Sequence, residues 1–160
     1  MFRAIAFIKF LIASTNQHGV HSPFMYNYVT KCLYKKDRLS EHKSKNVLLK
    51  SIAYFNVSSV FINDPDLKKM IQTKYPHLNY NKEFVDFVYL SEPIVNQVDA
   101  IKNHNNTVIF IDNIHKTKQT EMLWKKIKNL DTITVTVDLF YCAIVFFRKE
   151  QAKEHFNIRI

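Results

Sequence analysis

Thr107-Val108-Ile109-Phe110-Ile111 runs directly into Asp112-Asn113, and this stretch decides the fold class of the chain. A short apolar run of β-branched and aromatic residues, closed by a polar turn, is typical of a strand that is buried on both faces. Two earlier stretches have the same form, residues 59–62 before Asn63-Asp64-Pro65 and residues 84–90 before Ser91-Glu92-Pro93. Strands buried on both faces belong to parallel sheets that helices cover. The pattern therefore predicts an α/β fold.

Amphipathic stretches before and between these strands predict helices. One helix begins at Pro65 with Asp64 as its N-cap, and the next begins near residues 91–93. A third covers residues 117–129 and is expected to bury Met122, Leu123 and Ile127. On the amino-terminal side, the pattern predicts helices over residues 3–13, 23–33 and 46–55.

The last two predicted strands cover residues 133–140 and 142–147, with a single residue between them. Such a short connection requires antiparallel pairing, so these strands form a hairpin. Alternating strands and helices followed by a hairpin predict a parallel sheet with one antiparallel edge. Ligands of such sheets bind beyond the carboxyl ends of the strands. Residues 63–66, 91–92 and 112–115 are therefore expected to converge on one site.

Gly19 is the only glycine among 160 residues, where an average usage of about 7% would supply roughly eleven. It lies in the string His18-Gly19-Val20-His21-Ser22-Pro23-Phe24. We interpret this string as a turn in which Gly19 supplies a special backbone angle, Ser22 caps the next helix and Pro23 begins it. His18 and His21 have a spacing that can place two metal ligands on one helical face, but the sequence supplies no third ligand.

The formal charge of +9 is concentrated in the first half of the chain. Residues 1–80 hold 12 Lys and Arg against 4 Asp and Glu, whereas residues 81–160 hold 11 against 10. Such asymmetry is typical of surfaces that meet nucleic acid or anionic membranes. However, the cations are 19 Lys and 4 Arg, and Arg is the usual residue for bidentate recognition of phosphate and guanine. Specific nucleic-acid binding is therefore the less favoured interpretation.

Three features bear on the compartment. Residues 1–14 are mostly apolar but contain Arg3 and Lys9, which favours an amphipathic helix over a signal peptide. No apolar run reaches the roughly 18 residues of a transmembrane helix. Cys142 lies in an apolar run, 110 residues from Cys32, so a buried thiol is favoured over a disulfide. We expect a cytoplasmic protein, with peripheral membrane contact through the first helix as the alternative.

Two strings near opposite ends of the chain resemble a single bacterial family. One is residues 18–24, and the other is residues 133–140 followed by Val145-Phe146-Phe147-Arg148-Lys149-Glu150-Gln151-Ala152-Lys153-Glu154-His155-Phe156. With Ile111-Asp112-Asn113-Ile114-His115, they resemble class I S-adenosylmethionine-dependent methyltransferases related to O-methyltransferases. The resemblance covers residues 1–55 and 84–160. It implies a truncated Rossmann-like methyltransferase domain over residues 46–160, preceded by an N-terminal helical extension over residues 1–45.

The stretch between these parts departs from the family. Its members place a Glu-Leu-Gly-x-Gly-type loop after the first strand, whereas this chain has Asn63, Asp64 and Asp66 around Pro65. Asp64 brings a Cβ and a negative charge to a backbone that the cofactor must approach, and Pro65 removes an amide donor. By resemblance, Asn63, Asp64, Asp66 and Ser91 occupy degenerate cofactor-binding positions. The acidic residue that holds the cofactor ribose is missing, and strands are expected to be lost or collapsed within residues 64–83.

Asp112, Asn113 and His115 are the candidates for chemistry. Asp112 and Asn113 resemble the pair that holds a divalent metal in cation-dependent O-methyltransferases, and oxygen ligands suit magnesium or calcium. Ser91 stands near the place of a third ligand, so the alternative is that Asp112 caps the turn and Asn113 adopts a left-handed conformation. His115 could serve as a general base near neutral pH, or be a loop histidine bound to backbone. Trp124 is expected to pack in the core.

These observations favour a methyltransferase-like protein that keeps the scaffold and does not bind S-adenosylmethionine conventionally. It would be a pseudoenzyme or an interaction module for an unknown protein or small molecule, with no cofactor expected beyond the one implied by resemblance. One alternative is an active S-adenosylmethionine-dependent O-methyltransferase with an altered cofactor pocket. Another is a basic module that binds nucleic acid or an anionic surface. Lost strands would also expose a sheet edge through which a homodimer could form.

Overall fold

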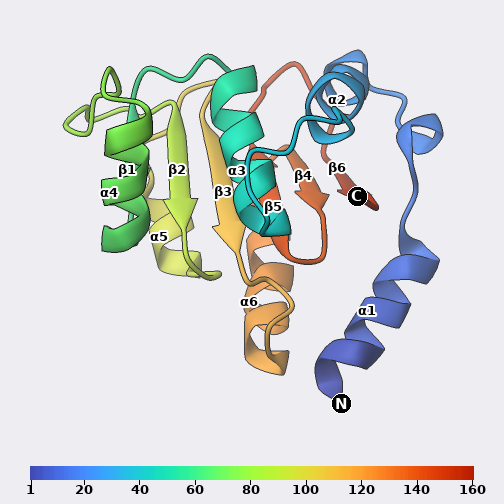
Figure 1. Ribbon diagram of the computed structural model, residues 1–160. Helices are drawn as coiled ribbons and strands as arrows, with labels where there is room; N and C mark the ends of the chain where they lie inside the picture. Colours follow the sequence, from blue (N-terminus) through green and yellow to red (C-terminus); the bar gives the residue numbers. More distant parts are fainter.

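The computed structural model describes residues 1–160 and begins with helices, continues with strands and helices that alternate, and ends with three consecutive strands (Figure 1). The helices are α1 (Phe2–Ala13), α2 (Pro23–Tyr28), α3 (Lys43–Tyr54), α4 (Pro65–Lys74), α5 (Val95–Ala100) and α6 (Lys118–Lys128). The strands are β1 (Val60–Ile62), β2 (Phe87–Leu90), β3 (Val108–Asp112), β4 (Val135–Asp138), β5 (Cys142–Phe146) and β6 (Glu154–Asn157). A 3₁₀ turn covers Gln17–Gly19, and a π-helical segment over Val29–Leu33 continues α2. None of these helices is both long enough and apolar enough to cross a membrane.

The 6 strands form one mixed sheet in the order β1-β2-β3-β5-β4-β6. β1, β2 and β3 pair in parallel, and β6 pairs in parallel with β4. β5 is antiparallel to both of its neighbours, β3 and β4. The predicted α/β class and the β4–β5 hairpin are therefore confirmed, and the architecture is compatible with a Rossmann-like fold. The prediction of an antiparallel edge is wrong, because the antiparallel strand lies inside the sheet.

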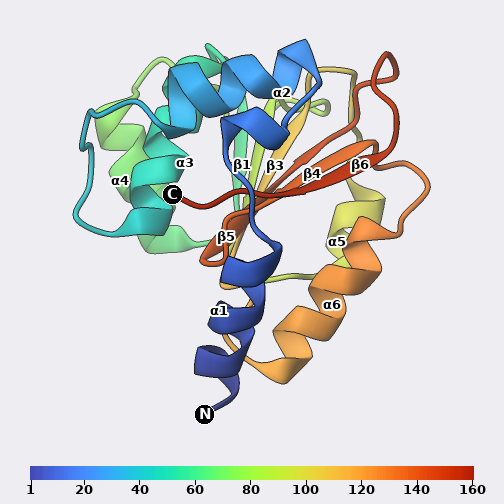
Figure 2. The ribbon, with the colours of Figure 1, turned by 90° about the vertical axis from the view of Figure 1, so that its right-hand side faces the viewer.

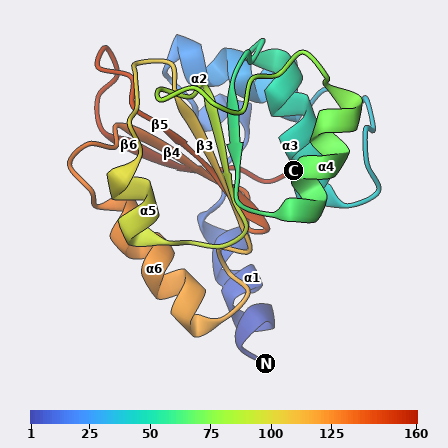
Figure 3. The same ribbon diagram turned by 90° about the vertical axis from the view of Figure 1, so that its left-hand side faces the viewer.

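Helices cover both faces of this sheet (Figures 2 and 3). Alternate residues of each strand point to opposite faces, as the two-residue repeat of a strand requires. Phe87, Tyr89, Val108 and Phe110 join the core formed with α2, α3 and α4, whereas Val88, Leu90, Ile109 and Ile111 join the core formed with α5 and α6. Each such buried side chain contributes about 1.5–3 kcal/mol relative to leaving it exposed. Cys32 and Cys142 are buried free thiols, as predicted.

Two helices begin at the predicted caps, Ser22 and Asp64, and α6 begins at a cap that was not predicted, Thr117. The side chains of Ser22, Asp64 and Thr117 each accept a hydrogen bond from the backbone N–H three residues further on, at 3.4, 2.7 and 3.1 Å. Pro23 and Pro65 follow two of these caps as the first helical residues. Because the first N–H groups of a helix lack partners within it, a side-chain acceptor and a proline at the start fix where the helix begins.

Three expectations about local structure are wrong. The helix after β2 begins at Val95, because residues 91–93 form a turn that is tied to neighbouring loops. Met122 is 52% exposed and Leu123 is only partly buried, whereas Ile127 is buried as expected, together with Thr120 and Trp124. Strand β6 was not predicted, because its residues are polar and mostly exposed and so lack an apolar pattern.

The predicted special backbone angle at Gly19 is also wrong, because its φ is not positive. A Cβ placed on Gly19 would lie 2.1 Å from Thr15 Oγ1, so the glycine permits a close approach between two chain segments. The left-handed angles fall on Asn56, Asn113 and Phe140, with φ of 49, 57 and 69°. Asparagine tolerates this region, whereas a bulky aromatic residue is held there only by its surroundings.

Residues 64–83 keep one trace of a further strand beyond β1. Asn79 pairs in parallel with Ser59 as an isolated bridge. Val60 N–H donates to the Asn79 carbonyl at 2.9 Å, and Asn79 N–H donates to the Ser58 carbonyl at 2.9 Å. This bridge covers the amino-terminal part of the outer edge of β1, the edge at which lost strands were expected.

Candidate functional site

The loops after β1, β2 and β3 are tied together at the carboxyl edge of the sheet. Ser91 N–H donates to Asn63 Oδ1 at 2.9 Å, and Asn113 Nδ2–H donates to the Ser91 carbonyl at 3.0 Å. Each contact joins two neighbouring loops, so the three strand ends form one continuous hydrogen-bonded set. Of the predicted residues, the structure thus brings together Asn63, Ser91 and Asn113. Their polar groups form hydrogen bonds with one another.

Asp64 and Asp66 lie outside this set. Asp64 caps α4, and Asp66 is exposed in the first turn of the same helix. Negative charge at this position is stabilised by the helix dipole, which explains both residues without a ligand. The Asp64 carboxylate is committed to the cap of α4, and Pro65 offers no backbone N–H to a ligand. The turn after β1 therefore has neither a glycine nor this amide to place against a ligand.

Asp112 ends β3 with both carboxylate oxygens occupied by donors. Its Oδ1 accepts from Ser44 Oγ at 2.7 Å and from Asn113 N–H at 2.9 Å, and its Oδ2 accepts from the Tyr89 hydroxyl at 3.2 Å. Burial, followed by the adjacent Asp112 carboxylate, raises the pKa of Tyr89 far above its ordinary value, so its hydroxyl stays a donor. No group of three or more His, Cys, Asp or Glu side chains is placed to hold a metal. Asp112 and Asn113 are therefore surrounded by donors instead of further acidic ligands.

A polar hollow of about 510 Å³ opens beside Asp112 and Asn113. Its other wall residues come from α1, the start of α3 and the β4–β5 turn: Arg3, Glu41, His42, Lys43, Ser44, Lys45 and Tyr141. The cationic groups of Arg3 and Lys43 lie 5.9 and 5.3 Å from the centre of the Tyr141 ring. Its volume is within the roughly 300–1,000 Å³ of small-ligand pockets. This hollow could not be predicted from the sequence because its walls are distant in the chain, and the dense positive charge before α3 was the one available signal.

His115 lies in a separate cluster of buried side chains. Its Nε2 is 2.8 Å from Asp138 Oδ2, its Nδ1 is 3.5 Å from Glu121 Oε2, and its ring stacks on Phe140 with centroids 5.2 Å apart. Burial opposes the ionisation of Glu121, but Lys125 at 2.5 Å and His115 together hold the pKa of Glu121 below its ordinary value. Both ring nitrogens of His115 face carboxylates, so the alternative of a histidine bound to backbone is wrong. The role of His115 as a general base stays a prediction.

Asp138 anchors this cluster and was not singled out from the sequence. Its Oδ2 also accepts from Trp124 Nε1–H at 2.8 Å, and its Oδ1 accepts from Phe140 N–H at 2.8 Å. Asp138 is 4% exposed and Trp124 is 1% exposed, so the tryptophan packs in the core as expected. A buried carboxylate that serves three donors stabilises a turn and a helix position together. The arrangement therefore holds Phe140 in its left-handed conformation.

The two strings at opposite ends of the chain contact each other at the end of the sheet opposite the carboxyl ends of β1, β2 and β3. Ser22 Oγ donates to Gln151 Oε1 at 2.6 Å, and the Arg148 guanidinium lies 4.3 Å from the centre of the Phe24 ring. Phe24 also meets Phe146 edge to face, with centroids 5.1 Å apart. His18 and His21 are exposed on the surface of this region. The strings therefore act together as a packing unit that joins α2 to the carboxyl-terminal segment.

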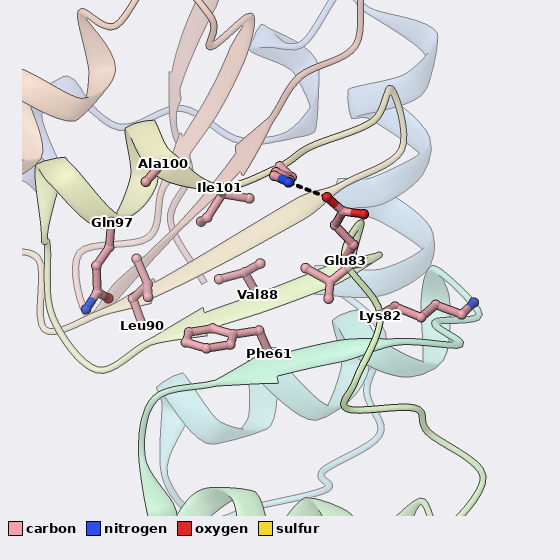
Figure 4. Close-up of a pocket in the computed structure, with 10 residues that line it drawn as sticks. Phe61, Lys82, Glu83, Val88, Leu90, Gln97, Ala100 and Ile101 are labelled. Carbon is pink, nitrogen blue, oxygen red and sulfur yellow. Dashed lines mark hydrogen bonds and ion pairs between the residues drawn. The ribbon is translucent and has the colours of Figure 1, made fainter.

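A second hollow of about 290 Å³ lies against the sheet beside β1 (Figure 4). Phe61, Val88 and Leu90 point into it from β1 and β2, facing Ile101. Helix α5 has only 6 residues, too short to extend over the edge strand, so Phe61 remains 48% exposed. None of the predicted strand-end residues lines this hollow.

No protein-family model, curated protein or solved structure matches this chain. Function is therefore inferred from three features: the contacts at the strand ends, the polar hollow and the resemblance of the two terminal strings. The contacts at the strand ends carry the most weight, because they show which polar groups are already bonded within the protein and which are free to bind a ligand.

Proposed function

We propose that this chain is a methyltransferase-like pseudoenzyme, which keeps the scaffold of class I methyltransferases and acts as an interaction module without conventional binding of S-adenosylmethionine. The mostly parallel sheet with its β4–β5 hairpin and amino-terminal helices supports the scaffold part of the proposal. The contact between the two terminal strings supports the interaction-module part of the proposal. The residues that carry the resemblance pack against each other, and this role does not require catalysis.

The observation that carries the proposal is the set of contacts among Asn63, Ser91 and Asn113. A cofactor laid across these strand ends would have to break both hydrogen bonds before it made its own. At about 0.5–1.5 kcal/mol each, their loss costs roughly 1–3 kcal/mol, or about tenfold to a hundredfold in affinity. These two bonds alone would weaken a micromolar affinity to about 10–100 μM. The Cβ of Asp64, the missing amide of Pro65 and the missing ribose anchor would weaken it further, toward the millimolar range.

A second candidate is an active methyltransferase whose pocket has moved. The polar hollow beside Asp112 and Asn113 favours it, because that hollow has the volume of a small-ligand site and lies at a strand end. Its wall is cationic and nearly without apolar residues, so an adenine ring would find little apolar surface there.

Calorimetric titration with S-adenosylmethionine and S-adenosylhomocysteine distinguishes these candidates. The pseudoenzyme proposal predicts no saturable heat below about 1 mM of either ligand. Low-micromolar binding would refute it and support the second candidate. The variant Asp64→Gly/Asp66→Gly tests the loop alone, and Asp131→Gly/Glu83→Gly is a control that removes two exposed carboxylates elsewhere.

A further inference from the structure

Helix α1 is apolar on two opposite faces. Its inner face places Ala6 and Phe10, which are buried, against Phe140 of the β4–β5 turn. Its outer face carries Ile5, Ile8 and Ile12, which are 47, 57 and 81% exposed, in line with Met1. Spacings of four, three and four residues bring these side chains onto one stripe of a helix. A helix that is apolar around its circumference is normally covered on all sides, and α1 is covered on only one.

The position of α1 leaves this stripe accessible. The helix extends beyond the end of the sheet, and its amino end lies farthest from the body (Figures 1 and 2). Its contacts with the protein are confined to the inner face, around the cluster of Ala6, Phe10 and Phe140. An extended flat surface can therefore meet the outer stripe without touching the sheet.

The charges around α1 identify the partner surface. The helix contains Arg3 and Lys9 and no acidic residue, and the chain has no acidic residue before Asp37. Lys43 and Arg159 line the cavity between α1 and the body. Glu41 and Asp112 are the acidic residues of the adjoining polar hollow, and the Asp112 carboxylate is already occupied by donors. Exposed isoleucines beside Lys9, on a helix without any acidic residue, suit a surface that is apolar inside and negatively charged outside.

Other occupants fit less well. A second copy of α1 would pair the stripe correctly, but it would bring the Arg3 and Lys9 side chains of both copies together with no acid to offset them. A nucleic acid would meet the cations but gain nothing from three exposed isoleucines. Lipid headgroups above acyl chains satisfy both requirements at once.

We propose that α1 docks this protein on an anionic lipid membrane surface. Ile5, Ile8 and Ile12 enter the boundary between headgroups and acyl chains, and Lys9 contacts lipid phosphate and carboxylate groups beside the helix. The inner face stays on Phe140, so the helix lies in the membrane plane between the lipid and the folded body. This inference goes beyond the proposed function, because it holds whether or not S-adenosylmethionine binds.

Vesicle co-sedimentation of the full chain tests the proposal. The vesicles are phosphatidylcholine alone, or phosphatidylcholine with about one-quarter phosphatidylserine, at low and physiological salt. We expect binding to the mixed vesicles at least about tenfold tighter than to neutral ones, and weaker binding as salt rises. Ile5→Ser/Ile8→Ser should reduce binding to mixed vesicles at least about tenfold, because it removes half of the apolar stripe. Lys9→Gln should reduce it by a smaller factor and weaken the salt dependence.

Phe61→Ser is the matched control, because Phe61 is a similarly exposed apolar residue on the opposite edge of the sheet. It should bind vesicles as the unmodified chain does, and circular dichroism should show that all variants stay folded. Equal binding to neutral and anionic vesicles, or full binding by Ile5→Ser/Ile8→Ser, would overturn the proposal. A dimer in light scattering that this double variant dissociates would overturn it in favour of a second copy. Competition by double-stranded DNA without any effect of the isoleucines would overturn it in favour of nucleic acid.

Discussion

Replacing Asp138 by asparagine removes the charge from a buried carboxylate that three donors share. In the folded protein, Oδ2 accepts from Trp124 Nε1–H and contacts His115 Nε2, while Oδ1 accepts from Phe140 N–H. An asparagine can place its carbonyl oxygen on only one of these two sides. On the other side, its NH₂ group faces a donor, so at least one buried N–H loses its acceptor.

The size of the effect follows from these contacts. A hydrogen bond to a charged group contributes about 1.5–3 kcal/mol, and the remaining bonds lose their charged acceptor. We therefore expect Asp138→Asn to lower the free energy of unfolding by about 3 kcal/mol, which in a chain of this length corresponds to a fall in Tm of roughly 6–12 °C. Asp138→Ala removes the acceptor from both sides and should destabilise the protein further.

Urea denaturation followed by fluorescence is the appropriate assay, because Trp124 is the chain's single tryptophan and lies in the cluster itself. Asp131→Asn is the control, since Asp131 is exposed and its charge loss should change stability by less than about 0.5 kcal/mol. A change within 1 kcal/mol of the unmodified chain for Asp138→Asn, with unaltered tryptophan emission, would refute the role assigned to this carboxylate.

Three further predictions concern other parts of the fold. Burial opposes the ionisation of Asp86, but hydrogen bonds from Ser58 and Ser59 lower the pKa of its carboxyl from 3.8 to about 2. The folded state therefore gains stability that is fully present above about pH 4 and is lost as the pH falls toward 2. This contribution to the free energy of unfolding is roughly 1–2 kcal/mol after solvent screening. Asp86→Asn should remove this pH dependence from a series of urea denaturations measured between about pH 4 and 2. Gly19→Ala should cost about 1–3 kcal/mol in the same assay, and combining it with Thr15→Ala should recover part of the loss; a neutral single variant would contradict the close contact. Asn113→Ala should lower stability by about 1–2 kcal/mol, and Asn113→Gly by less because glycine relieves the left-handed angle; equal effects would contradict a strain contribution.

The strands that could be predicted most directly from the sequence are those formed by continuous apolar runs. The runs that became β1, β3 and β5 are apolar at nearly every position, and their polar turns mark where each ends. Strand β6 could not be found in this way, because only Phe156 of its four residues is buried. The short connection between β4 and β5 also predicted that these two strands pair. It did not predict which strand pairs with the other edge of β5. That choice depends on contacts between residues far apart in the chain, such as Ile109 with Val145.

The candidate site was predictable in position and not in detail. Placing residues 63–66, 91–92 and 112–115 at the carboxyl edge required only the direction of the parallel strands. That Asn63 and Asn113 both bind the backbone of Ser91 depends on the spacing of three loops, which no local pattern encodes. The Asp138 cluster and the polar hollow were missed for the same reason. Gly19 shows the opposite error, because its rarity suggested a backbone angle where the cause is a neighbouring side chain.

We propose that the strand ends are closed by their own polar groups and do not hold S-adenosylmethionine conventionally. An amide-resolved NMR titration with S-adenosylhomocysteine, up to about 1 mM, tests it most directly because it reports on each loop separately. The account predicts that the Asn63, Ser91 and Asn113 backbone amide signals stay unshifted, and that the Ser91 amide remains protected from hydrogen exchange. Saturable shifts of these amides with a micromolar midpoint, together with loss of that protection, would contradict it.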